Sequence, residues 1–201
     1  MGACLSGFGT QWKNTSKTPM KVLVVGLNGA GKTTILYRLM LKEQVFTTPT
    51  LGYNSETFTP VPGLTFTMLD LGDWPKLRQR HWHNYRDAEG IAFVVDSADT
   101  SSLDDARDFL FKIVQLQGLP RAVPVVVFAN KQELNGAIDI YQLLEKLQLH
   151  TLCQNPWFLQ AASAAKGEGL LEGVKELGLM IQRYRQRNTL RRTRSLGSRP
   201  H

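Results

Sequence analysis

One glycine-rich stretch, VLVVGLNGAGKTT at residues 22–34, constrains the fold of this chain more than any other. An apolar run leads into the pattern G-x-x-x-x-G-K-T, which Gly26 and Gly31 bracket and a helix-forming segment follows. Glycine tolerates the positive φ angles of a tight loop, so backbone N–H groups can point inward at an anion near the helix N-terminus. Lys32 would reach the phosphates as a point charge, and the Thr33 hydroxyl would bind Mg²⁺. The stretch therefore predicts a phosphate-binding loop; the alternative is a glycine-rich turn without a ligand.

Strand and helix patterns alternate through the rest of the chain. Unbroken apolar runs favour buried strands, and amphipathic stretches favour helices. We expect strands at residues 20–25, 56–59, 64–69, 91–96, 123–129 and 157–161, and helices at residues 33–41, 105–116, 140–147 and 168–184. This alternation predicts an α/β fold with a doubly wound, mostly parallel sheet that binds its ligand at the carboxyl ends of the strands.

Length and charge divide the chain into one domain and two short ends. With 201 residues, 42% of them hydrophobic, the chain suits a single domain with a full core, which we assign to residues 19–184. The net charge of +7 comes from seven arginines without any acid among them, at positions 183, 185, 187, 191, 192, 194 and 199. The other basic residues equal the 17 acidic ones in number, so the basicity belongs to the tail. We expect residues 185–201 to form a basic, disordered extension.

Several classes of protein are disfavoured. No apolar run approaches the ~20 residues that span a bilayer, and no secretory leader is visible. Cys4 and Cys153 lie far apart in a chain that we expect in the cytoplasm, which argues against a structural disulfide. Nucleic-acid binding by the arginines is disfavoured, because Tyr184 is the one aromatic residue near them.

The first residues carry a lipidation pattern. MGACLS at residues 1–6 fits the acceptor for myristate on Gly2, with Cys4 as a candidate palmitate site. Apolar residues at positions 5, 8 and 12 would share one face of a short helix, which two glycines weaken. We therefore expect residues 1–18 to be an amphipathic, lipidated leader that places the protein on the cytosolic face of a membrane; the alternative is an unmodified, disordered leader.

Five segments resemble the Arf-like (ADP-ribosylation-factor-like) small GTPases of the Ras superfamily. They are GLNGAGKTTILY at residues 26–37, PTLGYN at 49–54, FVVDS at 93–97, FANKQE at 128–133 and GEGL at 167–170. The resemblance covers residues 1 to about 182. It implies the P-loop small G-protein fold, GTP or GDP with Mg²⁺ as cofactors, and a role as a switch in membrane traffic or signalling.

The same resemblance implies a role for each matching residue. Thr33 and Thr50 would bind Mg²⁺, Asp70 would hold that ion through water, and Asn130, Lys131 and the Ser163–Ala164 pair would frame the guanine. For Thr50 and Asp70 the alternatives are a threonine-rich coil and a strand cap. The full set of expected nucleotide-binding residues is Gly26, Asn28, Gly29, Ala30, Gly31, Lys32, Thr33, Thr34, Thr50, Asp70, Asp73, Asn130, Lys131, Glu133, Ser163 and Ala164.

Two departures from the family pattern affect hydrolysis. The family's Asp-x-Gly-Gly-Gln reads DLGDW at residues 70–74, so Trp74 replaces the glutamine that orients the attacking water. Indole offers only a donor, and no catalytic residue is assigned. Asp73 keeps the backbone N–H of the replaced glycine but adds a carboxylate, which would repel a γ-phosphate unless it points outward. Diphosphate recognition is unaffected.

Other departures affect recognition. Glu133 stands where the family has a base-reading aspartate, so the carboxylate moves by roughly a bond length. Asn28 replaces a common aspartate and removes a negative charge near the phosphates. The aromatic triad that relatives present to effectors reads Tyr53, Leu69 and Asn84, so partner choice does not follow from the family.

These features leave two hypotheses. The first is a lipid-anchored guanine-nucleotide switch with weak hydrolysis, whose partners are an anionic membrane surface and unidentified effector and exchange factor proteins. The second is a hydrolysis-dead pseudo-GTPase scaffold that acts through its surface and its basic tail. Trp74 and Asp73 favour the second, whereas Lys32, Thr33 and Thr50 favour real binding of Mg²⁺ and nucleotide.

Overall fold

The computed structural model describes residues 18–43, 53–71 and 85–197. Six of the residues discussed above for function lie outside these ranges. They are Gly2, Cys4, Thr50, Asp73, Trp74 and Asn84.

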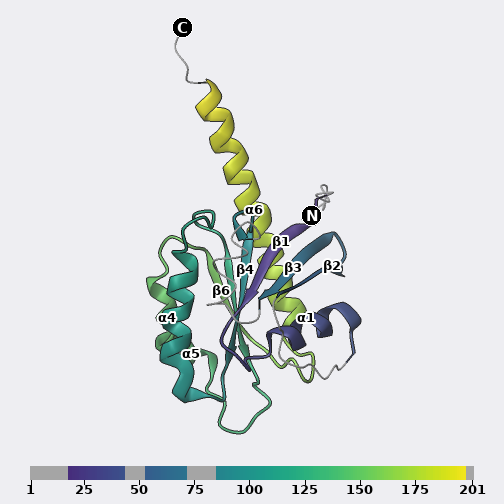
Figure 1. The fold of residues 1–201 in the computed structure, drawn as a ribbon, viewed down its shortest axis with the longest axis vertical. Coiled ribbons are helices and arrows are strands. Elements are labelled where there is room, and N and C mark those ends of the chain that lie inside the picture. The colour runs from purple at the N-terminus through teal and green to yellow at the C-terminus, as the bar shows by residue number, and fades with distance from the viewer. Residues whose placement is uncertain (1–17, 44–52, 72–84, 198–201) are drawn as a thin grey trace, which may run out of the picture.

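Six strands form one sheet in the order β2-β3-β1-β4-β5-β6 (Figure 1). They are β1 (Met20–Val25), β2 (Tyr53–Val61), β3 (Leu64–Leu71), β4 (Gly90–Asp96), β5 (Val125–Asn130) and β6 (Trp157–Ala161). β2 runs antiparallel to β3, and every other neighbouring pair is parallel. The doubly wound, mostly parallel α/β sheet expected from the sequence is confirmed.

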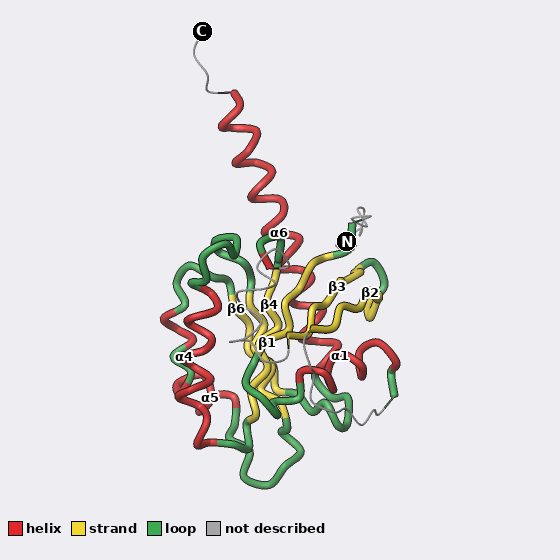
Figure 2. The backbone as a smooth tube through the Cα atoms, viewed as in Figure 1, coloured by secondary structure: helices red, strands yellow, loops and turns green. Residues whose placement is uncertain are grey.

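Helices cover both faces of this sheet, as Figure 2 shows. The helices and 3-10 turns are α1 (Lys32–Leu41), η1 (Thr100–Ser102), α4 (Leu103–Val114), α5 (Ile140–Lys146), η2 (Leu149–Thr151) and α6 (Leu170–Gly197). One core lies between the sheet and α4 with α5, and the other lies between the sheet and α1 with α6. Within β1, Leu23 and Val25 belong to the first core, whereas Val22 and Val24 belong to the second. This alternation explains why the strand reads as an unbroken apolar run.

The β2–β3 hairpin is longer than the sequence predicts. β2 continues through Pro60 to Val61, and its register against β3 shifts between Phe58 and Val61. Proline cannot donate a ladder hydrogen bond, so an irregularity at this point is the expected consequence.

The C-terminal helix corrects the prediction of a disordered tail. α6 does not end near Tyr184 but continues to Gly197, and Figure 1 shows it projecting beyond the sheet. Residues 179–196 contain neither glycine nor proline, so nothing in that stretch interrupts the helical backbone. Among the described residues, no helix combines the length and apolar character needed to cross a bilayer.

Arg185 also differs from expectation, because it is not a free arginine of the tail. Its guanidinium binds both carboxylate oxygens of Glu89, at 2.6 and 2.5 Å, and donates to the carbonyls of Thr18 and Pro19 at 3.2 and 3.1 Å. The start of β1 and the base of the projecting helix are therefore joined at the amino-end edge of the sheet.

Candidate nucleotide-binding site

The loop between β1 and α1 has the backbone that its glycines predict. Gly26, Gly29 and Gly31 have φ angles of 152°, 78° and 97°. A Cβ added to Gly26 would lie 2.1 Å from the Val94 carbonyl oxygen, and one added to Gly31 would lie 2.3 Å from Asn130 Nδ2. These two positions therefore require glycine for space as well as for conformation.

Lys32, the first residue of α1, places a buried cation beside this loop. Its side chain crosses back over the loop, and Nζ donates to the carbonyls of Gly26 at 3.1 Å and Leu27 at 3.0 Å. Burial lowers the pKa of the Lys32 ammonium, and the nearby Asp70 carboxylate opposes that shift. A cation that has lost most of its hydration and is held on neutral carbonyls can gain strongly from an anion.

Two oxygen ligands suited to Mg²⁺ meet at the end of β3. The Thr33 hydroxyl of α1 donates to Asp70 Oδ2 at 2.5 Å, and Asp70 is fully buried. Hydroxyl and carboxylate oxygens are hard ligands of the kind that Mg²⁺ prefers. The structure thus brings together two of the residues that the sequence assigned to the metal, from segments 37 positions apart.

Asn130, the last residue of β5, joins the phosphate loop to a third segment. Its Nδ2 donates to the Ala30 carbonyl at 2.8 Å, and its Oδ1 accepts from the Ala164 backbone N–H at 2.9 Å. Asn130 is 1% exposed, so both hydrogen bonds are made in the interior. A side-chain amide is required here because one bond uses a donor and the other an acceptor.

Lys131 and Glu133 follow Asn130 in the same loop. Lys131 adopts a left-handed φ of 67°, uncommon for a residue with a side chain, and its Nζ lies 2.6 Å from Asp96 Oδ2. Glu133 Oε2 is buried, and no hydrogen-bond partner for it exists among the residues that the structure describes. A buried carboxylate oxygen without a donor is costly, which makes it a receptor for N–H groups of a ligand.

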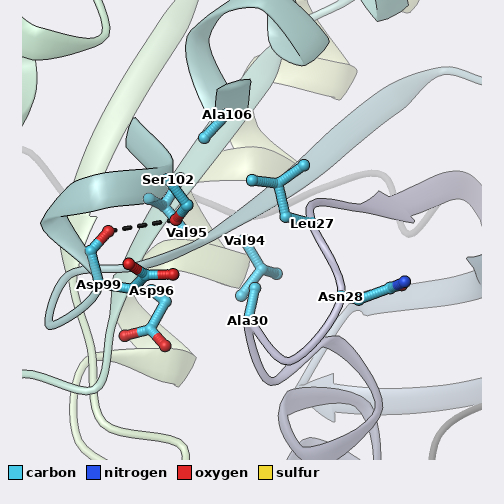
Figure 3. Close-up of a pocket in the computed structure, with 9 residues that line it drawn as sticks. All are labelled: Leu27, Asn28, Ala30, Val94, Val95, Asp96, Asp99, Ser102 and Ala106. Carbon is cyan, nitrogen blue, oxygen red and sulfur yellow. Dashed lines mark hydrogen bonds between the residues drawn. The ribbon is translucent and has the colours of Figure 1, made fainter. Parts of the chain in front are cut away.

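A cavity of about 90 Å³ borders the phosphate loop (Figure 3). Leu27 and Asn28 line it from the loop, and Asp96 and Asp99 contribute carboxylates. Figure 3 shows the Asn28 amide pointing away from those two acids. Lys131 already pairs with Asp96 at 2.6 Å, and Asp99 accepts from the Ser101 hydroxyl at 2.6 Å, so the two carboxylates would repel a phosphate here and this cavity is not the phosphate site.

The remaining predictions fall in different places. Asn28 is exposed, Thr34 is half-buried on α1, and Ser163 is buried at 1% exposure. Leu69, at the second position of the effector triad, is buried at 4% exposure and cannot face a partner.

The sequence analysis gave no role to two residues that the structure places at the site. Asp96 appears there only within the FVVDS motif, and Arg38 of α1 is not singled out at all. Asp96 ends the buried strand expected at residues 91–96, and a place at the carboxyl end of a parallel strand could have indicated its role; the structure aligns it with Asn130 of β5.

Comparisons with known proteins agree with this geometry. The family model of the ADP-ribosylation factor family matches residues 8–181. The structure is also similar to that of the Arl6 (BBS3) small GTPase from Trypanosoma brucei with the bound nucleotide analogue GppNp, at 32% sequence identity and a TM-score of 0.73. The match covers 83% of this chain and 99% of that one. Five motifs, the sheet order and the phosphate loop thus lead to one conclusion: this chain belongs to the ADP-ribosylation factor family of small GTP-binding proteins.

Proposed function

We propose that this chain binds a guanine nucleotide with Mg²⁺ at the carboxyl edge of its sheet and hydrolyses GTP very slowly. The observation that carries the proposal is Glu133 Oε2, buried and without a hydrogen-bond partner among the described residues. Guanine presents adjacent N–H donors that can satisfy such a carboxylate, whereas adenine has no N–H at the corresponding ring nitrogen. The extra methylene relative to the family's aspartate is compatible with this role.

The other residues have complementary roles. The N–H groups of the phosphate loop and the Lys32 ammonium would hold the phosphates. Thr33 would bind Mg²⁺ and Asp70 would hold it through water; when bound, the ion would supply positive charge that offsets the charge of the phosphates. Asn130 hydrogen-bonds both Ala30 of the phosphate loop and Ala164, so the residues expected at the phosphates and those expected at the base are held in a fixed relative position.

Slow hydrolysis is proposed from the sequence at residues 73 and 74. Trp74 has no acceptor with which to orient the attacking water, and Asp73 would add a negative charge near the γ-phosphate unless its side chain points outward. Charge stabilisation by Lys32 would remain, but positioning of the nucleophile would be lost. The intact phosphate loop favours this slow switch over a scaffold that binds no nucleotide.

Binding is tested by identifying the nucleotide released on denaturation of the purified protein, followed by calorimetry with GDP and Mg²⁺. Lys32→Ala should weaken GDP binding by about a hundredfold or more, because it removes the positively charged side chain beside the phosphate loop. Lys112→Ala, an exposed lysine of α4, is the matched control and should leave affinity unchanged. Unchanged affinity in Lys32→Ala would refute the proposal.

Hydrolysis is tested by single-turnover measurements on the GTP-loaded protein. We expect wild-type rates near background, and Trp74→Gln should raise them only in part because Asp73 remains. The double variant Asp73→Gly, Trp74→Gln should raise them further. Robust turnover by the wild-type protein would show that another residue positions the water.

We further propose residence on the cytosolic face of a membrane, through myristate on Gly2 and the arginines at positions 187, 191, 192, 194 and 199. One myristoyl chain anchors only marginally, and each arginine near an anionic leaflet adds about 1 kcal/mol. Support comes from the amino-end edge, where the Arg185 guanidinium donates to the Thr18 carbonyl at 3.2 Å, so the first described residue lies against the base of the projecting part of α6. Effector and exchange factor proteins would complete the cycle.

A further inference from the structure

Arg38 reaches from α1 to the loop that follows β6. Its Nη2 donates to the Lys166 carbonyl at 2.8 Å. A Cβ added to Gly167, whose φ is +83°, would lie 2.8 Å from Arg38 Nε and 3.1 Å from Nη2. The guanidinium therefore packs directly on the Gly167 backbone, and a side chain at residue 167 would have to displace it.

The loop that Arg38 contacts is closed by hydrogen bonds between its own residues, and Ser163 accepts several of them. The Ser163 carbonyl accepts from the N–H groups of Gly167 at 2.7 Å and Glu168 at 3.1 Å, and the Ser163 hydroxyl accepts from the Lys166 N–H at 3.1 Å. We call residues 163–168 the Ser163 loop. Because these bonds close it into a compact ring, a force on Lys166 or Gly167 moves Ser163 and Ala164 as well.

Two connections join the Ser163 loop to the phosphate side of the site. Asn130 links Ala164 to Ala30 of the phosphate loop. Arg38 forms the second link, since it lies on the helix that begins at Lys32, about 9 Å further along its axis. The base side and the phosphate side are thus braced at two separate points.

We propose that Arg38 is a positioning residue for guanine recognition, because it fixes the Ser163 loop relative to α1. The proposal rests on the nucleotide site described above and adds a residue that does not touch the nucleotide. A planar guanidinium suits the task, since it can hydrogen-bond one carbonyl while its face covers the adjacent glycine.

The test compares Arg38→Ala with the wild-type protein in the dissociation of a fluorescent GDP analogue. We expect dissociation about tenfold faster, the size of effect that one charge-assisted hydrogen bond produces. Competition by Mg²⁺-pyrophosphate, which has no base, should be unchanged. Arg38→Lys should restore part of the retention, and Arg107→Ala on α4 is the matched control without effect.

Equal weakening of GDP and pyrophosphate would overturn the proposal, because it would indicate a general role in stability. Unchanged GDP dissociation in Arg38→Ala would overturn it too. Amide hydrogen exchange of the nucleotide-free protein separates this inference from nucleotide binding itself. Arg38→Ala should raise the exchange rate of the Lys166 and Gly167 amides whether or not GDP binds. Unchanged exchange rates there would refute the claim that Arg38 fixes the Ser163 loop relative to α1.

Discussion

The two edges of the sheet handle their charges in opposite ways. At the amino-end edge, the Arg185 guanidinium is matched by both oxygens of Glu89 and by the carbonyls of Thr18 and Pro19. At the carboxyl-end edge, Lys32 is held on neutral carbonyls, and Glu133 Oε2 has no hydrogen-bond partner within the described part of the chain. The first edge satisfies its charges within the protein, whereas the second, besides the Lys131–Asp96 ion pair, keeps the charges of Lys32 and Glu133 for a ligand.

This difference separates structural charges from functional ones. A buried charge that lacks a full set of partners costs free energy, so a fold retains it where a ligand repays that cost on binding. A charge matched on all sides gains little from a further partner. Arginine content alone therefore overstates what the tail can offer to a membrane.

The largest effect should come from Gly26→Ala, which tests whether the carboxyl-end edge depends on close backbone approach. The added Cβ would lie 2.1 Å from the Val94 carbonyl oxygen. We expect the free energy of unfolding to fall by about 3 kcal/mol in urea denaturation. Gly29→Ala is the control, since Gly29 also has a positive φ, +78° against +152° at Gly26, but no atom of the described residues lies within 4 Å of the added Cβ, so this variant should cost about 1 kcal/mol. Equal losses would contradict the steric explanation.

Removal of residues 190–201 from the myristoylated protein should give the next largest effect. This truncation keeps Arg185 and its partners but deletes four arginines, so we expect about a hundredfold weaker binding to anionic vesicles in flotation. Binding to neutral vesicles should be unchanged, and high salt should abolish the difference. Equal flotation of both proteins on both kinds of vesicle would rule out a role for the tail.

Arg185→Gln and Glu89→Gln should destabilise the fold rather than weaken membrane binding. The two side chains are 22% and 25% exposed, so we expect each variant to lose about 1.5 kcal/mol of unfolding free energy, reduced by solvent screening. A double-mutant cycle should show that the losses are coupled. If Arg185→Gln instead lowered binding to anionic vesicles without changing the free energy of unfolding, the charge of Arg185 would serve membrane binding and not the stability of the fold.

The smallest effect concerns pH and Lys32 in the nucleotide-free protein. Burial lowers the Lys32 pKa in the folded state, so at alkaline pH the unfolded chain binds more protons than the folded one. Stability should therefore rise with pH through that window in the wild-type protein relative to Lys32→Met. Urea denaturation of both proteins across the alkaline range measures this, and a constant difference would show that Lys32 keeps its ordinary pKa.

Much of the fold followed from local pattern. The strand expected at residues 157–161 matches β6, and the phosphate loop lies between β1 and α1 as expected. Both could be predicted because a buried strand and a tight loop are each specified by residues close together in the sequence. The tail was mispredicted because its composition suggests disorder, whereas the helix continues from a packed body that has already nucleated it.

The sequence by itself determined the family, the α/β sheet and the residue types of the phosphate loop, since these are written in short motifs with fixed spacing. Only the tertiary structure decided that Arg185 hydrogen-bonds Glu89, 96 positions away in the sequence, and that Arg38 hydrogen-bonds the carbonyl of Lys166, 128 positions away. Such contacts arise where elements far apart in the chain are packed side by side. No local pattern encodes them, because each arginine would look the same in any exposed helix.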